Sequence, residues 1–134
     1  SINDVLYLHH DVLYAADGNI IALTKVQGIF DLTQFGGSAH DTVYTDGLVK
    51  LDRKGRTLWR WSLFDVLNPM TLSDIMEVKH DLGHANSVHE DKNGNLLISF
   101  RDFNQIWKIN PEGKLMWQLG KQGDFSNEER RGEN

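Results

Sequence analysis

The amino-acid sequence predicts an all-β fold made of two four-stranded antiparallel units, and an internal repeat is the first observation behind this prediction. Residues 11–25 match residues 87–101, and residues 48–61 match residues 106–119. The second observation is a turn signal inside each matching segment, at Gly18, Gly94, Gly55 and Gly113. Runs of β-forming residues on either side of such a glycine are typical of β-hairpins, so each unit contains two hairpins and therefore four strands.

The composition is that of a folded protein. The chain has 134 residues, of which 40% are hydrophobic and 25% charged, far from the composition of a disordered chain. Its formal net charge is −5, and its Lys and Arg residues form no stripe. We therefore expect no nucleic-acid partner, because non-specific binding to nucleic acid depends on clustered cations that face the phosphates.

The absence of cysteine excludes disulfides, thiolate metal sites and a cysteine nucleophile, but it leaves the cellular compartment open. No apolar run approaches the roughly 20 residues that a membrane-spanning helix needs. The first residues also lack the charged and apolar regions of a signal peptide. We expect no membrane partner.

The connections between the strands follow in order along the chain. The matching glycines of the first hairpins are 76 residues apart and those of the second hairpins are 58 apart, so the first unit is longer between its hairpins. This difference predicts a long loop over residues 26–46. The connector between the units, residues 62–79, is expected to contain a short helix around residues 72–78 that starts at Thr71 or Ser73.

Each unit has the pattern of a β-propeller blade, because four short antiparallel strands end in a strand with a tryptophan, Trp59 or Trp117. The expected divisions are blade one at about 5–63, a connector at about 64–82, blade two at about 83–120 and a polar, solvated tail at 121–134. A closed propeller needs four to eight blades, so two blades are expected to be a fragment or to form a homo-oligomer through their open edges. A small β-sandwich fits the strand count but does not explain the repeat.

Polar residues are expected to converge on the second unit. His84 and Asn86 are two residues apart, so on a strand they share a face. If residues 93–94 form a two-residue loop, Asn86 lies directly opposite Arg101, and Ser99 lies on the same face. These four side chains would then form one polar group on an otherwise apolar hairpin.

The first unit has an equivalent polar pair. The same register in the first hairpin places His10 opposite Lys25, and the repeat matches His10 with Asn86 and Lys25 with Arg101. Cationic and hydrogen-bonding groups at equivalent places in neighbouring blades suit a tetrahedral anion. The alternative is that these are ordinary polar residues, satisfied by one another or by water.

Other chemistries have weaker support. Six residues are of metal-ligand types, and the pair His-Asp occurs three times. The six residues are His40, His80 and His89 with Asp11, Asp41 and Asp81. Neither an HxH nor an HExxH spacing is present, so we expect no metal site. The glycine-rich segment 35–39 lacks the phosphate-binding loop pattern and is expected to be a plain loop. No cofactor is expected.

Three segments resemble the arylsulfotransferase family, bacterial enzymes that move a sulfuryl group between phenols without a nucleotide sulfate donor. They are residues 84–88 (HANSV), 98–109 (ISFRDFNQIWKI) and 113–120 (GKLMWQLG), and His10-Asp11 and Gly18-Asn19 precede them. The resemblance covers most of the chain, from His9 to Gly120. It implies a six-bladed propeller with the site in its central channel, a phenolic sulfate ester as donor and a phenol as acceptor. It also implies a periplasmic or extracellular location.

The resemblance further implies residue roles. His84, Asn86 and Arg101 would bind the sulfuryl group, and His10 would contribute from the neighbouring blade, or His9 if the alignment shifts by one. Together with the residue patterns above, this gives His84, Arg101 and His10 as expected catalytic residues, and Asn86, Ser99 and Lys25 as expected substrate-binding residues.

Family members form a sulfohistidine on another histidine, which lies in the blade after the Trp-x-Leu-Gly motif and makes the kinetics ping-pong. No histidine follows His89 in this sequence, so we expect the nucleophile outside the segment and the segment alone to be inactive. The alternatives are a non-catalytic propeller module that binds a ligand or a protein, and a quinone-dependent propeller dehydrogenase, which would not explain the HANSV block.

Overall fold

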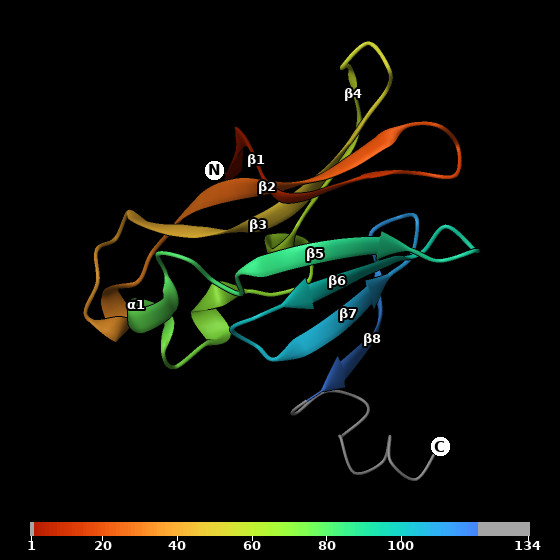
Figure 1. The fold of residues 1–134 in the computed structure, drawn as a ribbon. Coiled ribbons are helices and arrows are strands. Elements are labelled where there is room, and N and C mark those ends of the chain that lie inside the picture. Colours follow the sequence, from red (N-terminus) through yellow and green to blue (C-terminus); the bar gives the residue numbers. More distant parts are fainter. Residues whose placement is uncertain (1, 121–134) are drawn as a thin grey trace, which may run out of the picture.

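A computed structural model of the chain describes the backbone of residues 2–120 and the side chains of residues 12–120. It confirms the all-β prediction, with two four-stranded antiparallel sheets in which each strand pairs with its sequence neighbours (Figure 1). The first sheet contains β1 (Ile2–Tyr14), β2 (Ile20–Phe30), β3 (Asp41–Leu51) and β4 (Thr57–Ser62). The second contains β5 (Ala85–Glu90), β6 (Leu96–Phe100), β7 (Gln105–Ile109) and β8 (Leu115–Gly120). Two such meanders fit two propeller blades, and we call them blade one and blade two.

The two blades share one hydrophobic core. In Figure 1 the first sheet lies over the second, and β5 lies beside β1 and β2. The core side chains alternate along the strands; in β6, for example, Leu96, Ile98 and Phe100 are buried and the residues between them are half-buried. Burial of each such side chain contributes about 1.5–3 kcal/mol. Large core members from both blades include Leu23, Leu48, Trp61, Ile98, Phe100 and Trp107.

The indole of Trp61, in β4, connects the blades by a hydrogen bond as well as by packing. Its Nε1–H donates to the carbonyl oxygen of Gly113, in the β7–β8 turn, at 3.0 Å. The backbone N–H of Ala16, in the β1–β2 turn, donates to Glu90 Oε1, at the end of β5, at 2.7 Å. Hydrogen bonds therefore join the blades in addition to the shared core.

The turn between β5 and β6 is one residue longer than predicted, and this changes the register. The backbone of Asp91 pairs with that of Asn95, leaving three residues in the loop. The carboxylate of Asp91 accepts hydrogen bonds from the N–H groups of Asn93 and Asn95 and holds this wider turn. Gly94 supplies the left-handed conformation that a three-residue hairpin loop requires, with φ of 82°.

The predicted pairing of Asn86 with Arg101 is therefore wrong. Ser87 lies opposite Ser99 and Ala85 lies opposite Phe100, so Asn86 is the extra residue at an irregularity of the ladder. The first hairpin has the same three-residue turn, with Ala15 bonded to Asn19.

In β1 the register shifts twice more. Lys25 consequently lies opposite Val5, and the predicted pairing of His10 with Lys25 is also wrong. The side chain of His10, like that of His9, lies outside the described side chains.

The long loop predicted over residues 26–46 is mostly strand. β2 and β3 continue to pair as far as Phe30 and Asp41, and the connection is residues 31–40 with a short 3-10 helix, η1 (Thr33–Phe35). The added pairs are held by burial, since Val26 and Val43 are fully buried. The extra length of blade one is thus an extension of a hairpin.

The connector between the blades contains three short helical turns: η2 (Leu63–Asp65), η3 (Pro69–Thr71) and α1 (Ile75–Val78). Helix α1 lies within the predicted range but begins after Asp74 and not at Thr71 or Ser73. The buried side chains of Leu63 and Ile75 hold the connector on the shared core. Within residues 2–120, no helix has the length and apolar character that crossing a membrane requires.

Candidate functional site

A charged network connects the middle of blade one to the residues that precede blade two. Lys25 in β2 lies directly opposite Asp46 in β3, and its Nζ is 3.0 Å from Asp46 Oδ1. The same Nζ is 2.8 Å from Asp81 Oδ1, and Asp81 Oδ2 is 2.5 Å from Nδ1 of His84. We call Lys25, Asp46, Asp81 and His84 the Asp81 network.

The network is held in place by burial and by a backbone contact. The side chain of Asp46 is 1% exposed and its Oδ2 accepts the N–H of Ala85, the first residue of β5, at 2.6 Å. Because opposite charges and hydrogen bonds surround a largely dry carboxylate, Asp46 fixes the start of blade two against blade one.

The ionic states in the network support one another. Burial opposes ionisation of Asp81, but hydrogen bonds from His84 and Lys25 outweigh it and hold the pKa of Asp81 below its ordinary value. Burial also opposes the charged form of Lys25, but the carboxylates of Asp81 and Asp46 outweigh it and raise the pKa of Lys25. Lys25 is therefore a permanent cation at neutral pH.

His84 does not lie on the strand. Its φ is 49°, in the left-handed region, and β5 begins only at Ala85. The predicted shared face of His84 and Asn86 is therefore wrong, because the alternation of side chains applies only within a strand. The left-handed residue directs the imidazole toward Asp81 instead.

Arg101 is nevertheless a direct neighbour of His84. The backbone N–H of Arg101 donates to the carbonyl oxygen of His84 at 3.0 Å, and the N–H of Asp102 donates to the carbonyl oxygen of Gly83 at 3.1 Å. The guanidinium Nε is 3.2 Å from Asp102 Oδ1, and the side chain of Arg101 is 60% exposed. The permanent positive charge of Arg101 is thus exposed to solvent, on a residue adjacent to His84.

Three of the predicted site residues line one hollow, which we call the Arg101 hollow. It has a volume of about 370 Å³, and Asn86, Ser99 and Arg101 all contribute to its wall. An amide, a hydroxyl and a guanidinium can together donate several hydrogen bonds to the oxygens of an anion. The structure therefore brings these three residues together by a different register from the one predicted.

The remaining predicted residues are Lys25, His84 and His10, and the described lining of the Arg101 hollow does not include Lys25 or His84. Lys25 and His84 belong to the Asp81 network, and His10 lies outside the described side chains. Asp46 and Asp81 were not among the predicted site residues. Asp81 follows a histidine in one of three His-Asp pairs in the sequence, and this was the only local signal for it. Asp46 had no such signal, since its burial depends on the pairing of β2 with β3.

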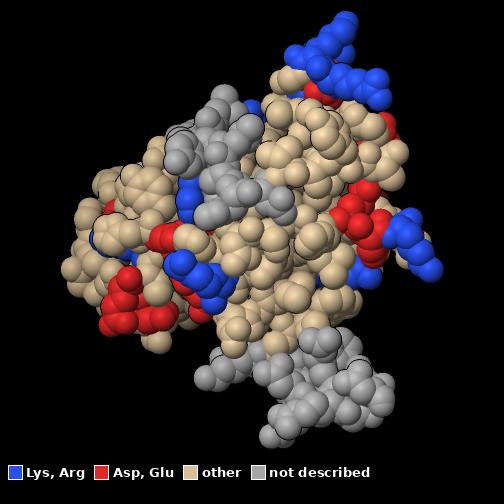
Figure 2. All heavy atoms as spheres, in the orientation of Figure 1, with Lys and Arg blue, Asp and Glu red and all other residues tan. Residues whose placement is uncertain are grey.

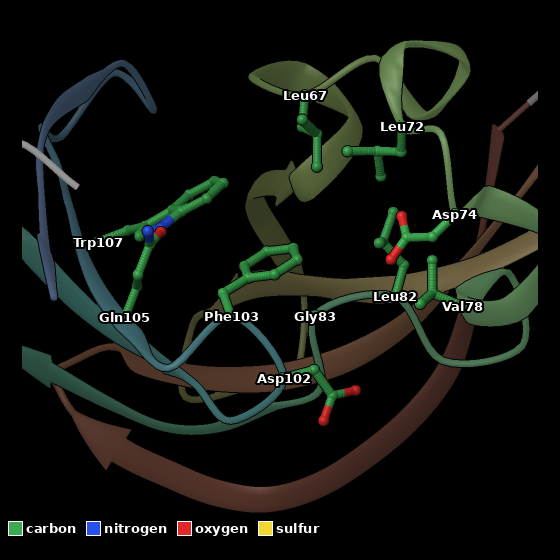
Figure 3. A pocket seen from close by; sticks show the side chains of 10 residues that line it. All are labelled: Leu67, Leu72, Asp74, Val78, Leu82, Gly83, Asp102, Phe103, Gln105 and Trp107. Atoms are coloured by element: carbon green, nitrogen blue, oxygen red, sulfur yellow. The ribbon is translucent and has the colours of Figure 1, made fainter. Parts of the chain in front are cut away.

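A further hollow, of about 450 Å³, lies between the connector and the β6–β7 turn (Figure 3). Its lining includes Gly83 and Asp102, the neighbours of His84 and Arg101, and it is otherwise mostly apolar. Sequence patterns did not predict this hollow, because residues from three separate segments form it.

On the face drawn in Figure 2, the charges are dispersed. Figure 2 shows small separate groups of Lys and Arg next to Asp and Glu, the largest at the tip of the β3–β4 hairpin. Among the residues whose side chains are described, no group of three or more His, Asp and Glu side chains is arranged to hold a metal ion. Among the polar features of the described residues, the Arg101 hollow is thus the one most suited to binding an anion, because the carboxylates of the Asp81 network already surround Lys25.

Comparison with known families gives one match. The family model described as arylsulfotransferase (ASST) matches residues 2–131. None of the curated proteins compared with the chain matches it.

Proposed function

Because the chain belongs to the arylsulfotransferase family, we propose that it forms part of a site that transfers a sulfuryl group from a phenolic sulfate ester to a phenol. The observation that carries this proposal is the position of Arg101, which shares a hollow with Asn86 and Ser99 and pairs through its backbone with His84. In this proposal Arg101, His84 and His10 are the catalytic residues, and Asn86, Ser99 and Lys25 bind or position the substrate.

Sulfuryl transfer requires cations and hydrogen-bond donors around the sulfuryl group while it is transferred. By analogy with phosphoryl transfer, the sulfuryl group passes through a loose transition state whose charge is spread over its oxygens. Arg101 offers a fixed charge and a planar set of donors, and Asn86 and Ser99 add neutral donors. These groups act by position and electrostatics, so they need no change of protonation.

His84 supplies the acid in this proposal. Asp81 accepts a hydrogen bond from Nδ1 and so orients the ring, as carboxylates orient histidines in many acid–base sites. Donation of a proton to the phenolate oxygen would assist its departure. Lys25 holds Asp81 in place and keeps it ionised.

The reaction has two transfers. In the first, the bond between sulfur and the phenolic oxygen breaks as a histidine nitrogen bonds to sulfur, and the phenolate leaves with a proton. In the second, the acceptor oxygen attacks sulfur, the nitrogen–sulfur bond breaks and the acceptor proton passes to a base. We propose that the nucleophilic histidine is supplied from outside these 134 residues, because no histidine follows His89.

A non-catalytic module that binds an anionic ligand is the second candidate. The observation that favours it is the orientation of His84, whose Nδ1 contacts Asp81, while the Arg101 hollow is lined by Asn86 and Ser99. A module of this kind would bind its ligand in the Arg101 hollow and would not use the imidazole of His84.

We propose that the chain self-associates through blade two. One of its faces carries Leu97, Ile106 and Leu119, which are only partly buried. The repeat matches these residues with Ile21, Leu48 and Trp61 of blade one, all of which are buried in the shared core. We call the three blade-two residues the open face, and a sheet of a second copy is the cover that the repeat suggests. A periplasmic or extracellular location is also a proposal, supported by the family alone.

The binding half of the proposal can be tested on the chain itself. Titration with 4-nitrophenyl sulfate, followed by NMR, should shift the signals of Asn86, Ser99 and Arg101. Arg101→Ala should abolish these shifts, whereas Lys92→Ala, which removes one positive charge from the exposed far end of the same blade, should preserve them. Retained binding in Arg101→Ala would contradict the anion site.

The catalytic half has a separate readout. With 4-nitrophenyl sulfate and a phenol acceptor, the chain alone should bind the donor and release no 4-nitrophenolate. Turnover by the purified chain would show that the nucleophile is present in it. In an assembly that turns over, His84→Ala should bind the donor as tightly as the natural chain. Its rate should fall more for donors with a poorly leaving phenol than for 4-nitrophenyl sulfate, because a general acid assists poor leaving groups most. An unchanged rate with every donor would contradict the acid role of His84 and favour the module candidate.

A further inference from the structure

The apolar hollow in Figure 3 has the size and the walls of a binding site for a small aromatic molecule. Its volume of about 450 Å³ lies in the range of small-ligand sites. Leu67 and Leu72 of the connector form one wall, and Leu82 forms the floor near Gly83. The opposite wall comes from Phe103 and Trp107.

The aromatic wall is closely packed. The rings of Phe103 and Trp107 are stacked, with centroids 5.4 Å apart and an angle of 16° between their planes. Phe100 packs behind both rings. The indole Nε1–H of Trp107 donates to Gln105 Oε1 at 2.7 Å, which fixes the ring in its plane. A stacked pair held in this way offers a preformed surface for a third ring.

The charges around the hollow favour a cation. Asp74 points into the space beside Leu72 and Val78, and Asp102 lies at the other end (Figure 3). No Lys, Arg or His is among the residues described as lining it. Asp102 is 3.2 Å from the guanidinium of Arg101 and is partly compensated. The side chain of Asp74 makes no capping hydrogen bond to α1.

We propose that this hollow binds the aromatic ring of an arylalkylammonium ligand, with the ring against Phe103 and Trp107 and the ammonium group beside Asp74. Gln105 lines both this hollow and the Arg101 hollow. If the aromatic ring of the ligand carries a phenol, the ligand could be the substrate of the proposed sulfuryl transfer, and that step rests on the proposed function. The binding site itself does not depend on it.

Two small probes of opposite charge test the site. 2-Phenylethylammonium and phenylacetate carry the same ring, and neither has a phenol or a sulfuryl group. In NMR titrations of the chain, 2-phenylethylammonium should bind about tenfold more tightly than phenylacetate, the scale of one solvent-screened charge pair. The shifted signals should include those of Leu67, Phe103 and Trp107.

Matched variants separate charge from folding. Asp74→Asn should remove the preference for the cation and keep the NMR spectrum of the folded chain. Glu77→Gln, which removes one charge from α1 at a residue outside the lining of the hollow, should keep the preference. Phe103→Ala should weaken both probes, and Phe103→Leu should recover part of the loss.

Equal affinities for the two probes, shifts confined to other surfaces, or an unchanged preference in Asp74→Asn would overturn the proposal. These results are independent of the anion site. If 4-nitrophenyl sulfate binds at Arg101 but 2-phenylethylammonium does not bind, the aromatic site fails alone. If the reverse holds, the aromatic site stands and the sulfuryl proposal fails.

Discussion

Lys25 and Asp81 lie in different parts of the fold, yet the Nζ of one is 2.8 Å from the Oδ1 of the other. Lys25 belongs to the centre of blade one, and Asp81 belongs to the connector that leads into blade two. The pair places His84 relative to blade one, because Asp81 also contacts the imidazole. The two blades thus contribute to one charged site.

A double-mutant cycle should measure this connection. The side chain of Lys25 is 26% exposed and that of Asp81 is 38% exposed, so water screens the pair. We expect a coupling free energy of about 0.5–1 kcal/mol from the urea unfolding of the natural chain, Lys25→Met, Asp81→Asn and the double variant. Additive single effects would show that the contact does not join the blades.

Asp46 should matter more to stability than Asp81. It is buried and accepts hydrogen bonds from the Ala85 backbone and from Lys25. Asp46→Asn removes the buried one of the two carboxylates that compensate Lys25, so we expect a loss of about 3 kcal/mol in the free energy of unfolding. Asp31→Asn, at an exposed loop residue, should cost under about 1 kcal/mol. Equal losses would show that burial of Asp46 is not the cause.

Acid should weaken the fold through Asp81 and Asp41. The pKa of each is lowered from 3.8, in Asp41 chiefly by the hydrogen bond from Lys79 and in Asp81 by contacts that outweigh burial. Each therefore stabilises the fold above pH 3.8, and this stabilisation is lost as the pH falls through the lowered pKa. Urea midpoints at decreasing pH should fall, and less steeply in Asp81→Asn. Parallel curves would contradict a role for Asp81.

Alkali should act through Lys25. Its pKa is raised above 10.5, so its contribution to stability is complete below that pH and is lost as the pH rises through the raised value. Lys25→Met should lower stability at neutral pH and remove part of the decline at high pH. An alkaline decline of unchanged size in this variant would assign it to other groups.

The indole N–H of Trp61 should contribute to the contact between the blades. Trp61→Phe leaves the carbonyl oxygen of Gly113 without this donor and removes volume from the core. We expect a loss of about 2 kcal/mol in the free energy of unfolding. Trp59→Phe, at a half-buried position in the same strand, should cost less. Both losses can be measured by thermal unfolding. A loss in Trp59→Phe as large as that in Trp61→Phe would contradict the contribution of the Trp61 N–H.

The open face should control the association state. Sedimentation velocity at increasing concentration should show a second, faster species for the natural chain. Ile106→Lys should suppress it, because a charge would be buried in the contact. Leu58→Lys, at an exposed apolar residue of β4 outside the open face, should not. A monomer at every concentration in the natural chain would exclude self-association.

The sequence predicted the fold better than it predicted the register. The repeat and the turn glycines were sufficient to identify eight strands in two sheets, since both are local signals. The length of the Asp91 turn was not predictable from its glycine, because two- and three-residue hairpin loops both accept glycine at that place. The side chain of Asp91 selects the longer one.

The candidate site shows the same division. Asn86, Ser99 and Arg101 were predicted to lie together, and they line one hollow even though the expected ladder is shifted. The left-handed backbone conformation of His84 could not be predicted from the residue type. It directs the imidazole toward Asp81 and away from the predicted face. The apolar hollow was not visible in the sequence, because it depends on how the connector packs against the β6–β7 turn.

The nearest-neighbour order of the strands has a consequence for how the protein folds. Because each strand pairs only with strands adjacent in sequence, every hairpin can form early from local contacts, at a low cost in loop-closure entropy. The Trp61–Gly113 and Lys25–Asp81 contacts span 52 and 56 residues, so docking of preformed sheets is expected to be the late step. Substitutions at these contacts should then accelerate unfolding and leave the rate of folding nearly unchanged.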